Sequence, residues 1–261
     1  MRTINATHYV TPLREGGSLP AIVEGDDDGT YVLKFRGAGQ GPKALIAELI
    51  SGEIARHLGL RVPEIVFAEL DPRMGKTEPD PEIQDLLRNS EGINLALDYL
   101  PGSIAFDPVV AMPIDGNPRL ASQIVWFDAL VTNVDRTARN TNLLVWHRDL
   151  WMIDHGATLI FHHTWDDYLS RGRAPFAQIR DHVLLRWASA IREADEELAP
   201  LLTLEAVERI IALVPESWLA GEPRFPSTAD HRAAYRDWLM TRLEQPRAWV
   251  EEAVRARTLL V

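Results

Sequence analysis

The stretch that decides the fold runs from Ala129 to Thr158 and reads ALVTNVDRTARNTNLLVWHRDLWMIDHGAT. It begins with the end of an apolar helix and continues into a polar loop that holds Asp135 and Asn140. Two short apolar runs follow, with a turn between them, and the second run leads to Asp154. Such runs fold back on each other as a hairpin, so we expect Asp154 to lie beside the loop that holds Asp135.

These three polar residues suit phosphoryl-transfer chemistry. Asp and Asn are common turn residues, so Asp135 and Asn140 alone would indicate only a polar turn. Asp154 changes that interpretation. Phosphoryl-transfer sites use one Asp to orient the acceptor hydroxyl, and an Asn and a second Asp to hold metal on the nucleotide phosphates. Magnesium prefers oxygen ligands, which a carboxylate and an amide supply.

The composition is that of an ordinary globular protein. The chain has 261 residues, 46% of them hydrophobic and 25% charged, which is enough for one large domain or one domain in two lobes. A formal net charge of −11 makes nucleic acid and anionic membranes poor partners. The chain has no cysteines, which excludes disulfides and cysteine zinc sites. With neither an apolar signal core nor a long apolar run, the protein is expected to be cytoplasmic.

The periodicity predicts a β-rich first part with one long helix, followed by a helical second part. Predicted strands cover residues 8–10, 19–24, 30–35, 65–70, 93–99, 143–146 and 150–153. Predicted helices cover residues 43–58, 79–87 and 120–131, with further helical patterns near 182–194, 204–214 and 229–254. The turn Leu100-Pro101-Gly102 is the candidate hinge between two lobes.

Lys34 is the candidate cation for nucleotide phosphates. It sits inside an apolar strand, where a lysine can simply face water or can contact phosphate. A lysine committed to phosphate needs an anion to fix its direction. Glu48 and Glu53 in the following helix both qualify, and periodicity does not choose between them.

Two glycine-rich loops compete as the phosphate-binding loop. Residues 37–44 join a strand to a helix as a Walker loop does, but they lack the Gly-Lys-Ser/Thr ending, and Pro42 removes a backbone donor. The other loop is Gly16-Gly17-Ser18, which precedes a predicted hairpin and could cover phosphates with backbone N–H groups.

Together these motifs resemble HipA-like kinases, bacterial relatives of protein kinases and phosphatidylinositol kinases. The matching stretches are Glu15 to Pro20, Tyr31 to Phe35, Glu48 to Pro63, Asn133 to Asn140 and Ile153 to Gly156. The resemblance implies an α+β, two-lobed protein-kinase-like fold. Residues 1–102 would form a β-rich N-lobe with one long helix, and residues 103–261 a mostly helical C-lobe.

The resemblance also implies an enzyme that uses ATP and Mg²⁺. Asp135 would be the catalytic base, and Asn140 and Asp154 the metal ligands. Lys34 would contact phosphate, and the order of the motif favours Glu48 over Glu53 as its partner.

The nucleotide would be held between the hinge and the glycine-rich loop. The adenine would lie near Asp98, Tyr99 and Leu100, and Gly16, Gly17 and Ser18 would cover the phosphates. Ser18 matches a serine that related kinases autophosphorylate, and a phosphate there would oppose ATP binding through its negative charge.

Two positions depart from the family pattern or leave it open. Thr137 stands where the family often has His, which puts rate or substrate in doubt more than fold. Asn142 rivals Asn140 as a metal ligand, although the spacing from Asp135 favours Asn140.

Three functions follow as hypotheses. The first is a kinase for Ser or Thr of a protein, in a toxin–antitoxin or defence setting with an antitoxin or operon partner. The second is a small-molecule phosphotransferase of the aminoglycoside-kinase type, with Asp166-Asp167 as a hint of a cationic acceptor. The third is a regulatory pseudokinase, which the presence of Lys34, Asp135, Asn140 and Asp154 argues against.

Overall fold

The computed structural model describes residues 1–13, 19–39, 41–71 and 80–260. The strands are β1 Thr3–Pro12, β2 Ala21–Gly25, β3 Thr30–Lys34, β4 Ile65–Leu70, β5 Gly92–Asp98, β6 Ile104–Ala105, β7 Leu143–Trp146 and β8 Asp149–Met152. The helices are α1 Pro42–His57, α2 Pro81–Asn89, α3 Pro118–Leu130, α4 Tyr168–Gly172, α5 Ile191–Leu198, α6 Leu204–Ile211, α7 Glu216–Leu219, α8 Thr228–Leu243 and α9 Ala248–Thr258. The predicted loop Gly16-Gly17-Ser18 lies outside the described residues.

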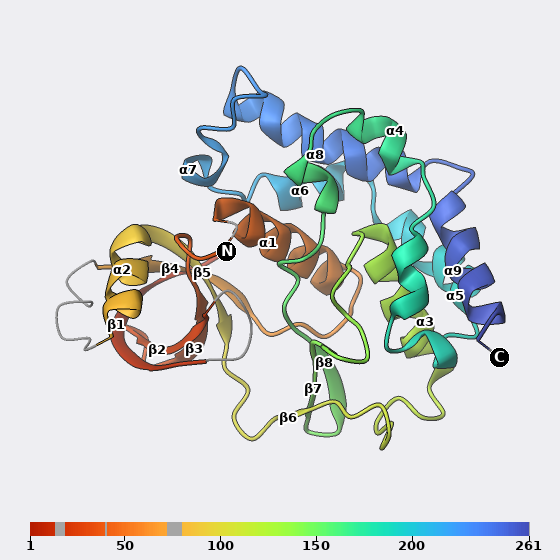
Figure 1. Ribbon diagram of the computed structural model, residues 1–261, viewed down its shortest axis with the longest axis horizontal. Helices are drawn as coiled ribbons and strands as arrows, with labels where there is room; N and C mark the ends of the chain where they lie inside the picture. Colours follow the sequence, from red (N-terminus) through yellow and green to blue (C-terminus); the bar gives the residue numbers. More distant parts are fainter. Residues whose placement is uncertain (14–18, 40, 72–79, 261) are drawn as a thin grey trace.

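The first five strands close into a barrel in the order β1-β2-β3-β5-β4 (Figure 1). Antiparallel pairs join most neighbours, and a parallel pairing of Thr3, Ile4 and Asn5 with residues 67–69 closes the ring. Successive side chains of a strand point to opposite faces, so Tyr31 and Leu33 enter the barrel core. The side chain of Lys34 therefore points outward, away from the barrel core.

Helix α1 crosses the centre of the molecule, between the barrel and the C-terminal helices (Figure 1). Its apolar residues belong to one continuous core with α3, β7, β8 and the later helices. It touches α6 and α7 on one side and β4 and β5 on the other. Gly52 allows the close approach to β4, because a Cβ at that position would overlap Ile65.

The second part of the chain is mainly helical, and its small sheet β6-β7-β8 lies at the bottom of the view in Figure 1. The predicted hairpin is present as β7–β8, with Leu143 paired to Met152. Three-residue to five-residue 3₁₀ helices also occur, at Ile160–His163, Ala177–Asp181, Leu185–Trp187 and Ala199–Leu201.

Two sequence predictions for this part are wrong in detail. The helical pattern over residues 229–254 is two helices, because the segment before Ala248 contains Pro246, which cannot donate a helical hydrogen bond. The pattern near residues 182–194 is helical only at Leu185–Trp187 and from Ile191 onward. The backbone N–H groups before it serve other contacts, since Val183 donates to the carbonyl of Arg136.

Within the described residues, no helix is both long enough and apolar enough to cross a membrane. A lobe boundary at residue 102 stays a prediction.

Candidate active site

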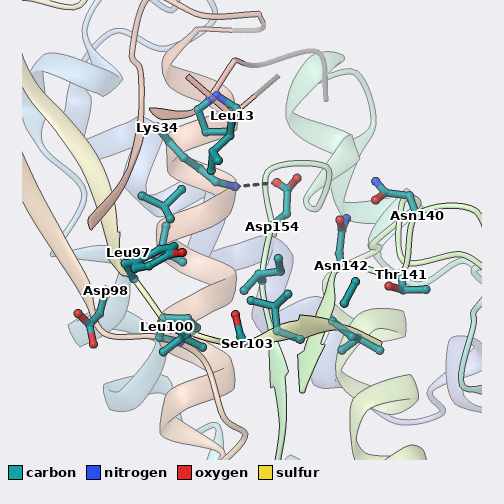
Figure 2. Close-up of a pocket in the computed structure, with 18 of the residues that line it drawn as sticks. Leu13, Lys34, Leu97, Asp98, Leu100, Ser103, Asn140, Thr141, Asn142 and Asp154 are labelled. Carbon is teal, nitrogen blue, oxygen red and sulfur yellow. Dashed lines mark hydrogen bonds and ion pairs between the residues drawn. The ribbon is translucent and has the colours of Figure 1, made fainter. Parts of the chain in front are cut away.

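Lys34 lies at the meeting point of three elements. Its Nζ is 2.5 Å from Oε2 of Glu48 on α1 and 2.6 Å from Oδ1 of Asp154 in the loop after β8 (Figure 2). Burial opposes the charge of Lys34, but the carboxylates of Glu48 and Asp154 outweigh it and raise the pKa of the lysine. Burial likewise opposes the charge of Glu48, yet Lys34 and His155 together outweigh it and lower the glutamate pKa to about 2.

Glu48, rather than Glu53, faces Lys34. Glu48 is fully buried, and its Oε2 also accepts a hydrogen bond of 2.8 Å from the backbone N–H of His155. The His155 ring is fully buried beside this carboxylate and meets Phe127 edge to face. Glu53 instead pairs with Arg56 one turn along the helix. The periodicity of α1 left this choice open because the helix is buried on every face from Leu45 to Gly52.

Asp154 is held next to Lys34 by the loop that follows the hairpin. Its backbone is left-handed, with φ of 55°, a conformation that Asp tolerates better than most residues. The preceding Ile153 donates its N–H to the carbonyl of Asn142 at 3.1 Å. This bond ties the loop after β8 to the loop before β7, so Asp154 lies beside the polar loop as the sequence predicts.

Asp135 is bound by both candidate amides. Its Oδ2 accepts hydrogen bonds from Nδ2 of Asn140 at 2.7 Å and from Nδ2 of Asn142 at 3.2 Å. Since each amide donates through nitrogen, each leaves its side-chain oxygen available to a cation. Figure 2 shows Asn142 nearer to Asp154 than Asn140 is. Thr137 donates its backbone N–H to the carbonyl of Asn140 at 2.9 Å and so closes the loop.

Asp128 is the residue that sequence reasoning missed. It is fully buried on α3, and its two oxygens accept from Nε of Arg136 at 2.6 Å and from Nδ2 of Asn133 at 2.8 Å. His182 donates to it from Nε2 at 2.8 Å, because Nδ1 of that ring accepts the N–H of Leu184. Burial opposes its charge, but Arg136 and His182 outweigh burial and lower the pKa of Asp128.

Asp128 thus fastens both sides of Asp135 to the core. Asn133 precedes Asp135, and Arg136 follows it and also donates to the carbonyl of Ile153 at 3.2 Å. The signal was present in the sequence as one carboxylate inside the apolar run from Val125 to Leu130. Its partners are up to 54 residues away, and no local pattern identifies them.

A cleft of about 730 Å³ connects these groups with the predicted hinge. Its lining includes Lys34, Asp98, Tyr99, Leu100, Arg139, Asn140, Asn142 and Asp154. Apolar side chains line the end near the hinge, among them Val32, Leu97, Leu144 and Ile153. Figure 2 shows the carboxylate of Asp98 directed away from Lys34, and partial burial raises the pKa of that carboxylate. Asp135 itself lies just behind the lining amides.

The segment after the hairpin does not extend this site. His162 is buried and hydrogen-bonded through Nδ1 to the hydroxyl of Tyr235 at 3.0 Å. Asp166 pairs with Arg224 at 3.0 Å, and neither Asp166 nor Asp167 lines the cleft. Among the described residues, no group of three or more His, Cys, Asp or Glu side chains is placed to hold a metal ion.

The model of one protein family, described as HipA-like kinase, matches residues 7–252. The chain belongs to the HipA-like kinase family. The resemblance seen in the sequence is therefore confirmed, and membership in this family indicates a phosphotransferase. No curated protein matches the chain.

One solved structure supports the fold. The proinflammatory kinase CtkA of Helicobacter pylori is similar over 99% of this chain and 99% of its own, with a TM-score of 0.52 and 14% identity. The predicted α+β protein-kinase-like fold is thereby confirmed. Two structures of the Golgi casein kinase are also similar: one with 11% identity over 98% of this chain and 73% of its own (TM-score 0.48), and one with Mn and ADP bound, with 12% identity over 95% and 74% (TM-score 0.46).

Proposed function

We propose that this HipA-like kinase transfers the γ-phosphoryl group of ATP, with Mg²⁺, to a hydroxyl group of Ser or Thr in a protein. The observation that supports it most is the convergence of Lys34, Asn140, Asn142 and Asp154 on one cleft, directly in front of Asp135. These residues come from a strand and from the loops before and after a hairpin, and they are up to 120 residues apart.

The cleft suits a nucleotide. Its apolar end near Leu97 and Leu144 offers a surface for a purine ring, and its other end carries Lys34. At the hinge, the N–H groups of Asp98 and Tyr99 are donated to the carbonyls of Glu64 and Thr30. Within the described part of the chain, the N–H of Leu100 has no acceptor, so it is the hinge donor that remains for an adenine nitrogen.

The donor set also fits magnesium. Asp154 uses Oδ1 for Lys34, which leaves Oδ2 free in a side chain that is 43% exposed. The amide oxygen of Asn140, or of Asn142, would supply the second protein ligand. All of these are oxygen donors, and the remaining ligands would be phosphate oxygens and waters. When bound, the ion would offset negative charge on the phosphates.

Asp135 then acts on the acceptor. Its carboxylate accepts the proton of the acceptor hydroxyl as that oxygen forms a bond to the γ-phosphorus and the bond to the leaving ADP oxygen breaks. The hydrogen bonds from Asn140 and Asn142 keep the Asp135 carboxylate oriented. Lys34 stays charged because two carboxylates surround it.

The alternatives have less support. A cationic aminoglycoside-type acceptor was suggested by Asp166-Asp167, but Asp166 is paired with Arg224 and both residues lie outside the cleft lining. A regulatory pseudokinase would not need the complete constellation around Asp135. An antitoxin or operon partner, as the resemblance implies, would then be either the acceptor or an inhibitor.

One experiment tests the proposal. The purified chain is incubated with γ-labelled ATP, Mg²⁺ and a cell lysate, and labelled species are identified by mass spectrometry. We expect label on Ser or Thr of a protein, and none with Asp154→Ala or with Mg²⁺ removed. Label on a small molecule would support the aminoglycoside-type alternative. No transfer, with ATP binding retained, would support the pseudokinase.

A further inference from the structure

Arg139 is a cation in the cleft that the roles above do not use. It lies in the polar loop between Asp135 and Asn140, is exposed, and lines the cleft together with Lys34 and Asp154. Among the described residues, no carboxylate pairs with it and no acceptor binds it. Arg136, three residues earlier, is by contrast fully buried and held by Asp128.

The backbone of the loop keeps Arg139 in place. Its neighbours form a closed turn, in which Thr137 donates its N–H to the carbonyl of Asn140 at 2.9 Å and the amide of Asn140 binds Asp135 at 2.7 Å. Arg139 lies inside this turn, and no residue that the structure describes binds its side chain. Figure 2 shows Asn140 and Lys34 on opposite sides of Asp154, and Arg139, which directly precedes Asn140 in the chain, lines the same cleft.

The groups assigned above carry too little positive charge to balance a bound triphosphate. Lys34 is the one positive charge among the groups assigned above, and it faces the carboxylates of Glu48 and Asp154, with Asp135 close by. Formally the site is negative by two charges. A divalent ion would neutralise that excess, which leaves the charges of the triphosphate unmatched. A guanidinium offers two parallel N–H donors that fit phosphate oxygens.

We infer that Arg139 binds the γ-phosphoryl group of ATP on the side facing Asp135. This inference rests on the proposed function. The side chain would donate to non-bridging oxygens of the phosphoryl group as it moves toward the acceptor, where preorganised donors stabilise developing charge. It would also disfavour polycationic acceptors at this mouth of the cleft.

The test compares nucleotides that differ by this one group. ADP lacks the γ-phosphoryl group, so Arg139→Gln should weaken binding of a non-hydrolysable ATP analogue by about 10-fold while leaving ADP affinity nearly unchanged, as measured by calorimetry with Mg²⁺. Transfer should fall in kcat by about 100-fold. Arg139→Lys, which keeps the charge, should recover part of the difference between the two nucleotides.

The matched control is Arg209→Gln, because Arg209 is an exposed arginine on α6 that does not line the cleft. It should change neither affinity nor rate. The inference would be overturned if Arg139→Gln left the ratio of ATP-analogue affinity to ADP affinity unchanged. A fall in kcat alone would not rescue it, because kcat also falls when a loop loses its shape. If the unmodified chain bound no ATP, the proposed function would fail and this inference with it.

Discussion

Arg136 and Asp128 form an ion pair of 2.6 Å in which both side chains are completely buried. The pair joins the last turn of α3 to the residue directly after Asp135. Because Asp128 also binds Asn133 and His182, a single carboxylate fixes the loop that the proposed chemistry depends on.

Replacement of Asp128 should destabilise the protein strongly. Asp128→Ala leaves the guanidinium of Arg136 buried without its partner, which costs about 3–5 kcal/mol of unfolding free energy. Urea titration followed by circular dichroism measures the loss. Glu197→Ala is the control, since it removes the exposed pair with Arg119 and should cost at most about 1 kcal/mol. Equal losses in the two variants would contradict the structural role of Asp128.

Removal of the proposed base should strongly slow phosphoryl transfer but leave nucleotide binding intact. Asp135→Ala should lower the transfer rate by about 10²- to 10⁴-fold, because the acceptor hydroxyl loses its proton acceptor. Nucleotide affinity should persist, since Lys34, Asp154 and the hinge remain, and calorimetry would detect it. Asp85→Ala, at a surface position on α2, should transfer normally. Full activity of Asp135→Ala would be fatal to the assignment.

The two amides can be told apart by their magnesium requirement. Asn140→Ala should raise the Mg²⁺ concentration needed for half-maximal transfer if Asn140 is the ligand, as its spacing from Asp135 predicts. Asn142 has φ of 48°, so Asn142→Gly removes its amide without imposing a strained backbone. This second variant should keep the Mg²⁺ requirement of the unmodified chain. The opposite result would assign the metal to Asn142.

Acid should weaken the fold through Glu48. Its pKa lies at about 2, below its ordinary value of 4.5, so the folded state favours the charged form. The resulting stability is present above about pH 4.5 and is lost as pH falls toward 2. Asp128, whose pKa is also lowered, adds to the same trend.

Urea titrations at several pH values between 6 and 3 would measure this dependence. Glu48→Gln should show a shallower fall in unfolding free energy with acid than the unmodified chain, because one titrating group is gone. Identical pH profiles would show that Glu48 does not contribute.

Local patterns predicted most elements of the fold. The strand Ile65–Leu70 and the first strand of the hairpin, Leu143–Trp146, have the predicted bounds, and α1 is displaced by one residue. Alternation and helical periodicity act over a few residues, so a single sequence displays them. The same patterns placed Lys34 in a strand and Asp154 after one, which was enough to suggest the site.

Contacts between residues far apart in the sequence could not be predicted from these local patterns. The parallel pairing that closes the barrel joins residues more than 60 positions apart. β1 begins at Thr3 but was predicted only over residues 8–10, because Asn5 and Ala6 interrupt the strand-forming residues before them. Asp128 was overlooked for a similar reason, since its role depends on His182, which approaches through the irregular segment after Ala177–Asp181.

Through helix α1, the C-terminal helices affect how tightly the cleft would bind ATP, although they do not line it. In the described part of the molecule, every residue that lines the cleft precedes residue 155. Yet α6 and α7 hold α1, and Trp218 on α7 donates to the carbonyl of Ile93 on β5 at 3.0 Å. A shortened chain that ends before α6 would retain each cleft residue and still lose nucleotide affinity, because Glu48 would no longer be fixed against Lys34.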